Sequence, residues 1–396
     1  MGQERKPSQG GTGGGELELY LHIPFCVKKC NYCDFLSAPA DREVREAYIS
    51  AMCQEIRGRA QEAEAYKVSS IFVGGGTPSL LEPEQFVELF DNLREAYHLM
   101  HPAEITLEAN PGTLDKAKLE AYRECGVNRL SMGLQSTVDE ELRTLGRIHS
   151  YRQFLESYQL AREEGFTNIN VDLMSSLPGQ TTDSYRKGLQ RILELSPAPE
   201  HISAYSLILE EGTPFYERHR EGSLMLPTEE EDREMYRLTG ELLGGAGYER
   251  YEISNYARPG FACRHNKGYW QRKNYLGFGI GAASLMENQR FANSGDLRRY
   301  LSSPMGARGE RQTLCVQEQM EETMFLGLRL MQGISLEAFE ESFGCKLETV
   351  YREPLERNIR DGLLHLEGGR VSLTQRGIDV SNYVMAQFLF DERPGL

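Results

Sequence analysis

The stretch from Leu19 to Phe35, LYLHIPFCVKKCNYCDF, carries three cysteines in the pattern C-x-x-x-C-x-x-C. Cys26, Cys30 and Cys33 therefore share one short loop after an apolar segment. Thiolates are soft ligands that select zinc, copper(I) or iron–sulfur clusters. Because a cubane iron–sulfur cluster normally takes four cysteines, three would leave one iron with an open coordination position. The alternative is a zinc site in which His22 supplies the fourth ligand.

A glycine-rich motif, GGGTP, spans residues 74–78. Without Cβ atoms, the backbone of such a turn can approach a ligand closely and bond to it through N–H and C=O groups. The motif lacks the lysine of a P-loop and does not match G-x-G-x-x-G. Alone it would be interpreted as a structural turn. Beside the cysteine loop, Gly75, Gly76 and Thr77 become candidates for binding a cofactor.

Four polar side chains further along the chain add charge and hydrogen-bonding capacity: Glu108, Gln135, Arg147 and Asp172. A guanidinium binds a carboxylate through paired hydrogen bonds, and carboxylates accept hydrogen bonds from ammonium groups or ribose hydroxyls. The set suits a zwitterionic amino acid joined to a nucleoside. Taken singly, each residue is explained as well by a surface charge or a helix cap.

Strand-like runs alternate with helical segments over the first half of the chain. The runs span residues 17–23, 69–75, 104–110, 127–135, 168–174 and 201–209. Helical periodicity marks residues 43–56, 84–97 and 117–125. This spacing predicts an α/β fold with a parallel sheet, namely a partial (β/α)6 barrel of the TIM type, with a doubly wound open sheet as the alternative. In a barrel, residues that follow the strands meet at one mouth, which is where the candidates above would lie.

Composition and pattern divide the chain into four parts. Residues 1–16 form a Gly-rich polar tail that we expect to be disordered. Residues 17–235 are assigned to the barrel, and residues 236–311 to a connecting segment. Residues 312–396 are predicted to form a mainly helical, winged-helix-like C-terminal domain with a hairpin that turns at Gly368-Gly369.

The composition, with 40% hydrophobic and 26% charged residues, is typical of a soluble globular protein. A net charge of −15, with no basic cluster to offset it, disfavours nucleic acid as a partner. The sequence shows neither an apolar run that could span a membrane nor a secretory signal, so we expect a cytoplasmic protein with reduced thiols. The remaining cysteines are interpreted as small buried hydrophobes: Cys53, Cys125, Cys263, Cys315 and Cys345.

The cysteine spacing, followed by GGGTP on a βα barrel, resembles the radical S-adenosylmethionine (SAM) superfamily. The resemblance implies that Cys26, Cys30 and Cys33 hold a [4Fe–4S] cluster, whose fourth iron is chelated by the amino and carboxylate groups of SAM. It also implies that SAM is contacted by a set of residues in the matching motifs: Tyr20, Gly75, Gly76, Thr77, Glu108, Gln135, Arg147 and Asp172.

From Leu17 to about Phe390 the chain further resembles the coproporphyrinogen oxidase-like branch of that superfamily. The matching stretches are YLHIPFC, FVGGGTPSLL, TLEANPGT, RLSMGLQS, LGRIHS and HISAYSLILEEGTPFY. Oxygen-independent coproporphyrinogen III oxidases carry a further cysteine two residues after the third, where this chain has Phe35. HemW-type heme chaperones have Phe-like residues there and an H-N-x-x-Y-W motif, to which HNKGYW from His265 to Trp270 is similar.

The resemblance to HemW-type proteins implies a heme chaperone that binds heme and transfers it to acceptor hemoproteins. It implies His265 as the heme ligand, and Cys263 is the alternative, since thiolate also binds heme iron. Membrane-bound respiratory enzymes are among the expected acceptors, which would bring a cytoplasmic protein to the membrane periphery. A homodimer is a further hypothesis.

Three other functions are alternatives. The first is coproporphyrinogen III oxidation by radical decarboxylation of propionates, so whether the chain is an enzyme stays open. The second is heme degradation by radical methyl transfer, and the third is a structural cluster protein without a heme role. One departure concerns the substrate side: where relatives read D-L-Φ-Y-G-L-P-G-Q-T, with Φ apolar, this chain reads DLMSSLPGQT. Ser175 and Ser176 therefore replace an aromatic residue and a glycine.

Overall fold

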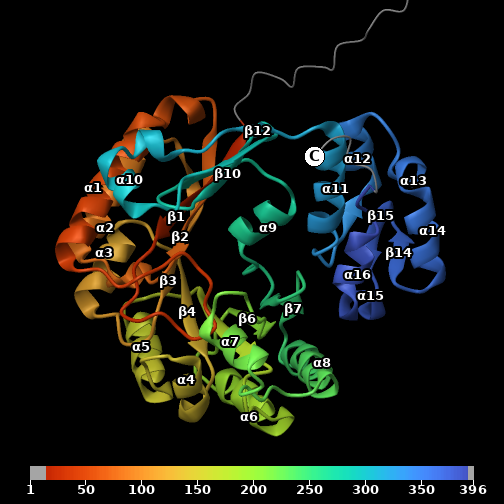
Figure 1. The fold of residues 1–396 in the computed structure, drawn as a ribbon, viewed down its shortest axis with the longest axis horizontal. Coiled ribbons are helices and arrows are strands. Elements are labelled where there is room, and N and C mark those ends of the chain that lie inside the picture. Colours follow the sequence, from red (N-terminus) through yellow and green to blue (C-terminus); the bar gives the residue numbers. More distant parts are fainter. Residues whose placement is uncertain (1–14, 391–396) are drawn as a thin grey trace, which may run out of the picture.

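The computed structural model of the chain describes residues 15–390. The tail predicted over residues 1–16 lies almost entirely outside the described residues. Figure 1 shows a larger lobe, in which strands line the inside and helices the outside, beside a smaller C-terminal lobe. The C-terminal lobe faces the open side of the strands.

Six parallel strands form the centre of the larger lobe, and they pair with one another in chain order. They are β1 (Glu16–Ile23), β2 (Lys67–Gly75), β3 (Leu99–Ala109), β4 (Arg129–Gln135), β5 (Ile169–Ser175) and β6 (His201–Ser206). A doubly wound sheet would reverse its strand order, whereas a sequential order is that of a barrel. The predicted strands and the α/β barrel class are therefore confirmed.

The barrel is partial because its two edges pair with other strands instead of with each other. The flanking strands are β7 (Glu249–Arg250), β8 (Asn255–Ala257), β9 (Tyr275–Phe278), β10 (Ala283–Met286), β11 (Gln289–Ala292) and β12 (Gln312–Thr313). The complete sheet has the order β12-β11-β10-β9-β1-β2-β3-β4-β5-β6-β8-β7. Residues 236–311, expected to connect the two domains, thus contribute strands to both edges of the same sheet.

Helices cover the convex face of the strands (Figure 1). They are α1 (Arg42–Gly58), α2 (Pro83–Ala96), α3 (Lys116–Glu124), α4 (Asp139–Leu145), α5 (Tyr151–Glu163), α6 (Thr182–Leu193) and α8 (Glu229–Gly245). Helix α7 (Pro214–Arg220) packs instead near the carboxyl ends of the strands, where Phe215 joins an apolar cluster with Met174. Several begin at a polar residue whose side chain accepts a hydrogen bond from the first turn, as Asp41, Asp115, Ser150 and Thr181 do. Such caps satisfy backbone N–H groups that have no partner inside the helix.

The alternation of side chains along each strand makes the concave face polar. In β1, Leu17, Leu19 and Leu21 are buried in the core shared with the outer helices, while Glu18 and His22 point inward. Inward-facing polar residues of the other strands are also buried: Ser70, Glu104, Arg129, Asn170 and His201. Barrel interiors are usually filled by branched apolar side chains, so this interior needs polar partners.

A short helix, α9 (Arg264–Trp270), supplies many of those partners from the concave side (Figure 1). The backbone N–H groups of Arg264 and His265 donate to the Glu104 carboxylate over 3.0 and 3.1 Å. At Gly268 the helix lies flush on β1, since a Cβ there would come within 1.9 Å of Glu18 Oε1. The helix therefore fills part of the open barrel.

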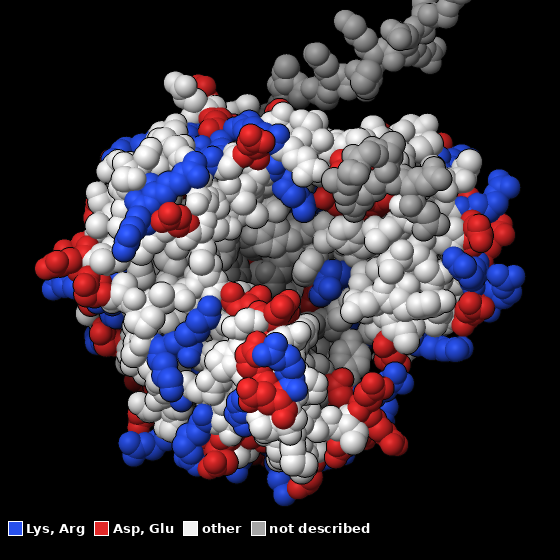
Figure 2. Space-filling view, in the orientation of Figure 1, with Lys and Arg blue, Asp and Glu red and all other residues white. Residues whose placement is uncertain are grey.

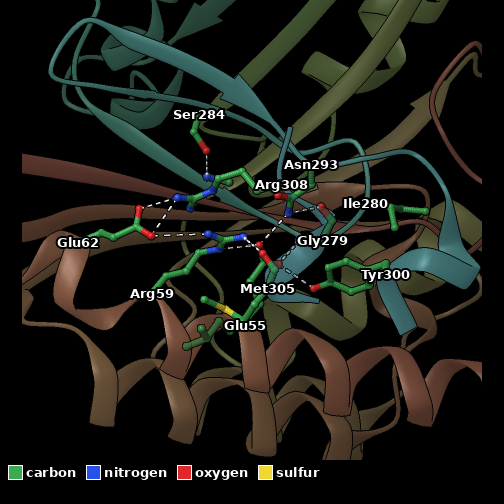
Figure 3. Close-up of polar contacts among 12 residues, drawn as sticks. Glu55, Arg59, Glu62, Gly279, Ile280, Ser284, Asn293, Tyr300, Met305 and Arg308 are labelled. Atoms are coloured by element: carbon green, nitrogen blue, oxygen red, sulfur yellow. Dashed lines mark hydrogen bonds and ion pairs between the residues drawn. The ribbon is translucent and has the colours of Figure 1, made fainter. Parts of the chain in front are cut away.

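A buried charge network fastens the later strands to α1, and Figure 3 shows its members converging. Glu55 Oε1 accepts from Arg59 Nε over 2.9 Å and from Asn293 Nδ2 over 2.8 Å. Glu55 Oε2 accepts from the Gly279 backbone over 3.0 Å and from the Tyr300 hydroxyl over 2.8 Å. Three of these four hydrogen bonds thus join α1 to residues more than 200 positions away along the chain.

The C-terminal lobe has its own apolar core, which includes Met324, Phe339, Tyr351 and Phe388. Its helices are α11 (Val316–Gly327), α12 (Leu336–Phe343), α13 (Leu347–Val350), α14 (Arg352–Arg360), α15 (Gln375–Asp379) and α16 (Ser381–Ala386), while α10 (Leu297–Ser302) precedes the lobe. A small sheet orders β13 (Ile334–Ser335), β15 (Arg370–Leu373) and β14 (Leu364–Glu367). The predicted hairpin turn at Gly368-Gly369 is confirmed, and both glycines have positive φ.

Glu55 is fully buried, so its truncation tests the charge network. We expect Glu55→Ala to lower the free energy of unfolding by about 3–5 kcal/mol, because it leaves a buried guanidinium without its closest partner. The measurement is urea unfolding followed by far-UV circular dichroism. Glu46→Ala, which breaks an exposed pair with Arg42, is the control and should change little. An unchanged urea midpoint for Glu55→Ala would contradict the role assigned to the network.

Candidate cofactor site

The predicted site residues meet in a cavity of about 370 Å³ at the carboxyl ends of the central strands. Cys26, Cys30 and Cys33 line one side of it, from the loop that follows β1. Gly75, Gly76 and Thr77 line the adjacent side, after β2. The walls and floor are completed by Glu108, Gln135, Asp172 and Tyr205, from the ends of β3, β4, β5 and β6, and by Arg147, from the segment between α4 and α5. The structure thus brings together segments from seven positions along the chain.

Backbone and side-chain hydrogen bonds hold the cysteine loop. Cys26 N donates to Ala38 O over 3.1 Å, and Asn31 N donates to Leu145 O over 2.9 Å. His22 Nε2 donates to Leu36 O over 2.9 Å, which leaves Nδ1 to accept from the Tyr20 hydroxyl at 3.0 Å. Both nitrogens of His22 are therefore used, and the ring does not line the cavity as the zinc alternative would need.

Polar groups approach two of the three thiols. Thr77 Oγ1 donates to Cys26 Sγ over 3.6 Å, and Arg147 Nη1 donates to Cys30 Sγ over 3.8 Å. Burial raises the pKa of Cys33, and the neighbouring Cys30 adds to this rise. Within residues 15–390 no three His, Cys, Asp or Glu side chains already converge as a closed metal site. The three thiols therefore line one cavity but do not converge on a single metal position.

The glycines allow the GGGTP turn to pass close to the cysteine loop. A Cβ on Gly76 would lie 2.7 Å from Phe25 O and 2.9 Å from Phe25 N. Gly75 has φ of 114°, a region that favours glycine, and its backbone N donates to Glu108 Oε2 over 3.0 Å. A side chain at Gly75 would also collide with the His22 ring at 2.7 Å. The turn is thus fixed between β1 and β3.

Two carboxylates share the floor of the cavity. Burial raises the pKa of Glu108 to about 8, and repulsion from Asp172 contributes. Burial also raises the pKa of Asp172, although hydrogen bonds donated by the Tyr205 hydroxyl and Asn170 Nδ2, each over 2.7 Å, oppose the rise. Two acidic groups held this close favour a ligand that brings positive charge or hydrogen-bond donors.

Gln135 and Arg147 complete the wall on the side of β4. Gln135 has φ of 72°, which is uncommon for a residue other than glycine, and backbone strain of this kind is frequent at functional sites. Within the described part of the chain its buried Oε1 has no hydrogen-bond partner. Arg147 Nη2 donates to Asn110 Oδ1 over 2.7 Å, and Asn110 Nδ2 donates to Thr77 Oγ1 over 2.7 Å. Asn110 therefore links the guanidinium to the glycine turn.

These residues fit a [4Fe–4S] cluster with SAM. Cys26, Cys30 and Cys33 offer three soft ligands on one wall. The unpartnered Gln135 oxygen and the two floor carboxylates supply acceptors for ammonium or hydroxyl donors. Arg147 supplies a cation that can hold a carboxylate.

Not every predicted contact lies at the cavity. Tyr20 does not line it, and its hydroxyl bonds to His22 instead. Conversely, several residues that line the cavity were not predicted from the sequence: Asn110, Tyr32, Ser131 and Met174. Asn110 directly follows β3, so its position next to a strand end was the available signal.

His265 lies apart from the cavity, inside the contact between α9 and the strands. It is 1% exposed. Its Nδ1 is 2.9 Å from Ser70 Oγ and its Nε2 is 3.0 Å from the Tyr269 hydroxyl. Burial lowers the pKa of His265 to about 3, and the buried Arg129 adds to this, so the ring is neutral at pH 7. Cys263 is buried as well, and its Sγ donates to Glu104 Oε1 over 3.4 Å.

The two serines that replace an aromatic residue and a glycine form a hydroxyl cluster. Ser176 keeps a positive φ of 59°, as a glycine would, and donates to the Asp232 carboxylate. Ser206 Oγ donates to the same oxygen over 2.7 Å and lies 3.1 Å from Ser175 Oγ. These hydrogen bonds link the ends of β5 and β6 to α8. Polar contacts therefore stand where the related pattern has an aromatic side chain.

Figure 2 shows basic and acidic side chains interspersed over the viewed face, which is hollowed between the two lobes. Among the helices of the described chain, none is long and apolar enough to cross a membrane.

Comparisons with known proteins extend over almost the whole chain. Sequence models of protein families match the radical SAM superfamily at residues 20–192 and the HemN C-terminal domain at residues 315–380. The heme chaperone HemW of Lactococcus lactis is 37% identical over 374 residues, covering 94% of this chain and 97% of the relative. HemW of Bacillus subtilis is 36% identical over 378 residues, covering 93% and 98%.

Among solved structures, coproporphyrinogen III oxidase (HemN) from Escherichia coli, a radical SAM enzyme, is similar with a TM-score of 0.81. It is 26% identical, and the match covers 94% of this chain and 89% of that one. A partial parallel barrel with three cysteines and a glycine turn at its mouth, matched by the superfamily model, places the chain among radical SAM proteins. Within that superfamily, the chain belongs to the HemW family of heme chaperones.

The raised pKa of Glu108 predicts a pH-dependent stability cost at this site. The folded protein holds the Glu108 proton more tightly than the unfolded chain, so this group costs stability as the pH rises from about 4.5 to about 8. Glu108→Gln removes that cost. We expect the variant to be more stable than the wild type at pH 8.5, with the difference vanishing near pH 4.5. Urea unfolding at both pH values measures it, and the exposed Glu340→Gln is the control. Equal stabilities at pH 8.5 would contradict the assignment.

Proposed function

We propose that the protein is a radical SAM-type heme chaperone, which binds heme and transfers it to acceptor hemoproteins. The observation that carries the proposal is the placement of two motifs on one barrel. The three-cysteine cavity occupies the mouth, and the helix formed by HNKGYW docks on the concave face of the same strands. Relatives over nearly the full length are named heme chaperones, which supports the same function here.

In this proposal the cavity residues hold a [4Fe–4S] cluster and SAM. The cluster with SAM supplies one-electron chemistry when bound. Thr77 and Arg147 orient the Cys26 and Cys30 thiols through the hydrogen bonds described above. Glu108 and Asp172 would accept hydrogen bonds from the ammonium or hydroxyl donors of SAM, and a cationic ligand would relieve the repulsion between them.

We propose His265 as the heme ligand, a role that requires a ring nitrogen to become free. Neutral imidazole is a common axial ligand of heme iron, and burial keeps this ring neutral. Yet Ser70 and Tyr269 engage both ring nitrogens in the described conformation. Ligation therefore requires α9 to leave the concave face, or at least the Tyr269 hydroxyl to release Nε2.

A second candidate function, coproporphyrinogen III oxidation, is favoured by the structural likeness to HemN. Phe35 argues against it, since the corresponding position in those oxidases carries a fourth cysteine. Phe35 is 62% exposed and lines the cavity mouth, so this chain offers an apolar ring where those enzymes offer a thiol.

An anaerobic heme titration of the cluster-reconstituted protein tests the proposal. We expect saturation at about one heme per chain, with a spectrum of imidazole-ligated iron. His265→Ala should lose or alter that spectrum. Tyr269→Phe frees Nε2 without removing the ring, so it should bind heme at least as fast as the wild type. His219→Ala, an exposed histidine on α7, is the matched control.

Two results would decide against this assignment. Weak and unsaturable binding by the wild type would remove the chaperone function. Saturable binding with the same spectrum in His265→Ala would show that His265 is not the ligand and would favour Cys263.

The oxidase alternative has its own test. We expect no decarboxylated tetrapyrrole when the reconstituted protein is incubated anaerobically with coproporphyrinogen III, SAM and a strong reductant. Product analysis by chromatography measures this, and Cys30→Ser, which should lose the absorption of the cluster, controls for background. Product that depends on Cys30 would establish the oxidase function instead.

A further inference from the structure

A second cavity, of about 620 Å³, lies between the two lobes and is separate from the cofactor site. We call it the interdomain cavity. It is bounded by the end of α9 at Trp270, the β10–β11 turn at Asn288, helix α11 at Thr323, and helix α12 at Ala338 and Phe339. Its volume falls in the range of roughly 300–1,000 Å³ that is typical of small-molecule and cofactor sites, which favour domain interfaces.

Flat apolar side chains form part of its wall. Trp270 and Phe343 are partly exposed and present aromatic rings, whereas Phe339, Leu330 and Ile334 are almost fully buried and line the cavity only at their edges. On α12, Ala338 and Ser342 are one helical turn apart, exposed and small, so that this side of the cavity is open. A wall that combines two aromatic rings with polar groups suits a wide, flat ligand that also carries polar substituents.

The charge of the cavity is opposite to that of the whole chain. Among the described residues that line it, the charged ones are Arg272 and Arg370 and none is acidic, although the chain carries 59 acidic residues against 44 basic ones. Arg272 Nε is paired with Glu322 over 2.9 Å, and Arg370 donates from Nε and Nη2 to backbone carbonyls. Among the described residues no hydrogen bond uses Nη1 of either arginine. Both can therefore still donate to an anion.

One buried polar group near this region has no partner. Trp270 Nε1 is buried, and within residues 15–390 it makes no hydrogen bond. Arg329 lies over the indole ring at 4.3 Å. A ligand in the cavity could accept from this N–H only if the side chains around the indole move.

We propose that the interdomain cavity seats the tetrapyrrole that this protein carries, with the aromatic wall against the macrocycle and Arg272 and Arg370 toward its carboxylates. The proposal rests on the proposed heme-chaperone function. It adds that the macrocycle is recognised independently of its iron, since the described residues that line the cavity include no histidine, cysteine or methionine. His265 would reach the iron of a seated macrocycle only after the movement of α9 described above, so binding of the macrocycle can be tested without iron ligation.

Iron-free protoporphyrin IX is the probe for the seat, because it has the macrocycle and both carboxylates but needs no axial ligand. We expect the reconstituted wild type to bind it saturably, measured by the change in porphyrin fluorescence. Ala338→Trp and Ser342→Trp fill the cavity from α12 and should weaken binding by about ten-fold or more. Glu341→Trp places the same bulk on the same helix outside the cavity lining and should bind as the wild type does.

Replacement of an arginine tests the proposed contact with the carboxylates of the tetrapyrrole. Arg370→Gln should weaken protoporphyrin binding by about ten-fold, as expected for the loss of a charged hydrogen bond, whereas Arg360→Gln on exposed α14 should not. Unchanged far-UV circular dichroism establishes that each variant is folded.

The outcomes separate the two proposals. If the wild type binds heme but Ala338→Trp, Ser342→Trp and Arg370→Gln bind protoporphyrin as it does, the seat lies elsewhere and the inference is overturned while the chaperone function stands. If the wild type binds heme but no iron-free protoporphyrin, recognition depends on the iron and the inference is likewise wrong. If the wild type binds neither, the proposed function fails and the seat fails with it.

Discussion

The Glu104 carboxylate on β3 accepts hydrogen bonds from the first backbone N–H groups of α9, and the arrangement of the concave face depends on this contact. A parallel barrel that does not close exposes its interior, and here that interior is polar. Polar groups buried without partners are costly, so an open and polar barrel needs something to occupy it. Helix α9 meets this need with its backbone, with His265 bonded to Ser70, and with Gly268 pressed against Glu18. A motif interpreted as a heme site is therefore also a structural part of the barrel.

In the cavity at the barrel mouth, by contrast, several buried groups keep unfavourable contacts or lack partners. Glu108 and Asp172 repel each other in a buried floor, and Gln135 combines a strained φ with an unpartnered oxygen. Each feature costs stability in the protein alone, and each is relieved by a ligand that brings charge or hydrogen-bond donors. Favourable caps and buried contacts elsewhere, such as the network around Glu55, offset this cost. Strain of this kind is expected where a site is arranged for its ligand before the ligand binds.

Sequence patterns predicted the parts of the molecule that are governed by local rules. The six strands and the carboxyl-end placement of Cys26, Gly75 and Asp172 follow from periodicity and from the geometry of parallel barrels. Contacts between distant segments could not be predicted in this way. Glu55 and Asn293 are separated by 238 positions, and nothing in either neighbourhood indicates that they pair. The burial of His265 depends likewise on the docking of a seven-residue helix, and a seven-residue pattern does not reveal the surface it packs against.

Trp270 is the single tryptophan of the chain, and its position has a practical consequence. The indole sits where α9 ends, beneath the Arg329 guanidinium of the C-terminal lobe. Any movement of α9 away from the barrel, or of one lobe relative to the other, must change the environment of this ring. The protein thus contains a natural optical reporter, whose emission belongs to one known site and requires no label. Stopped-flow recording of that emission would give the opening and closing rates of the interface directly.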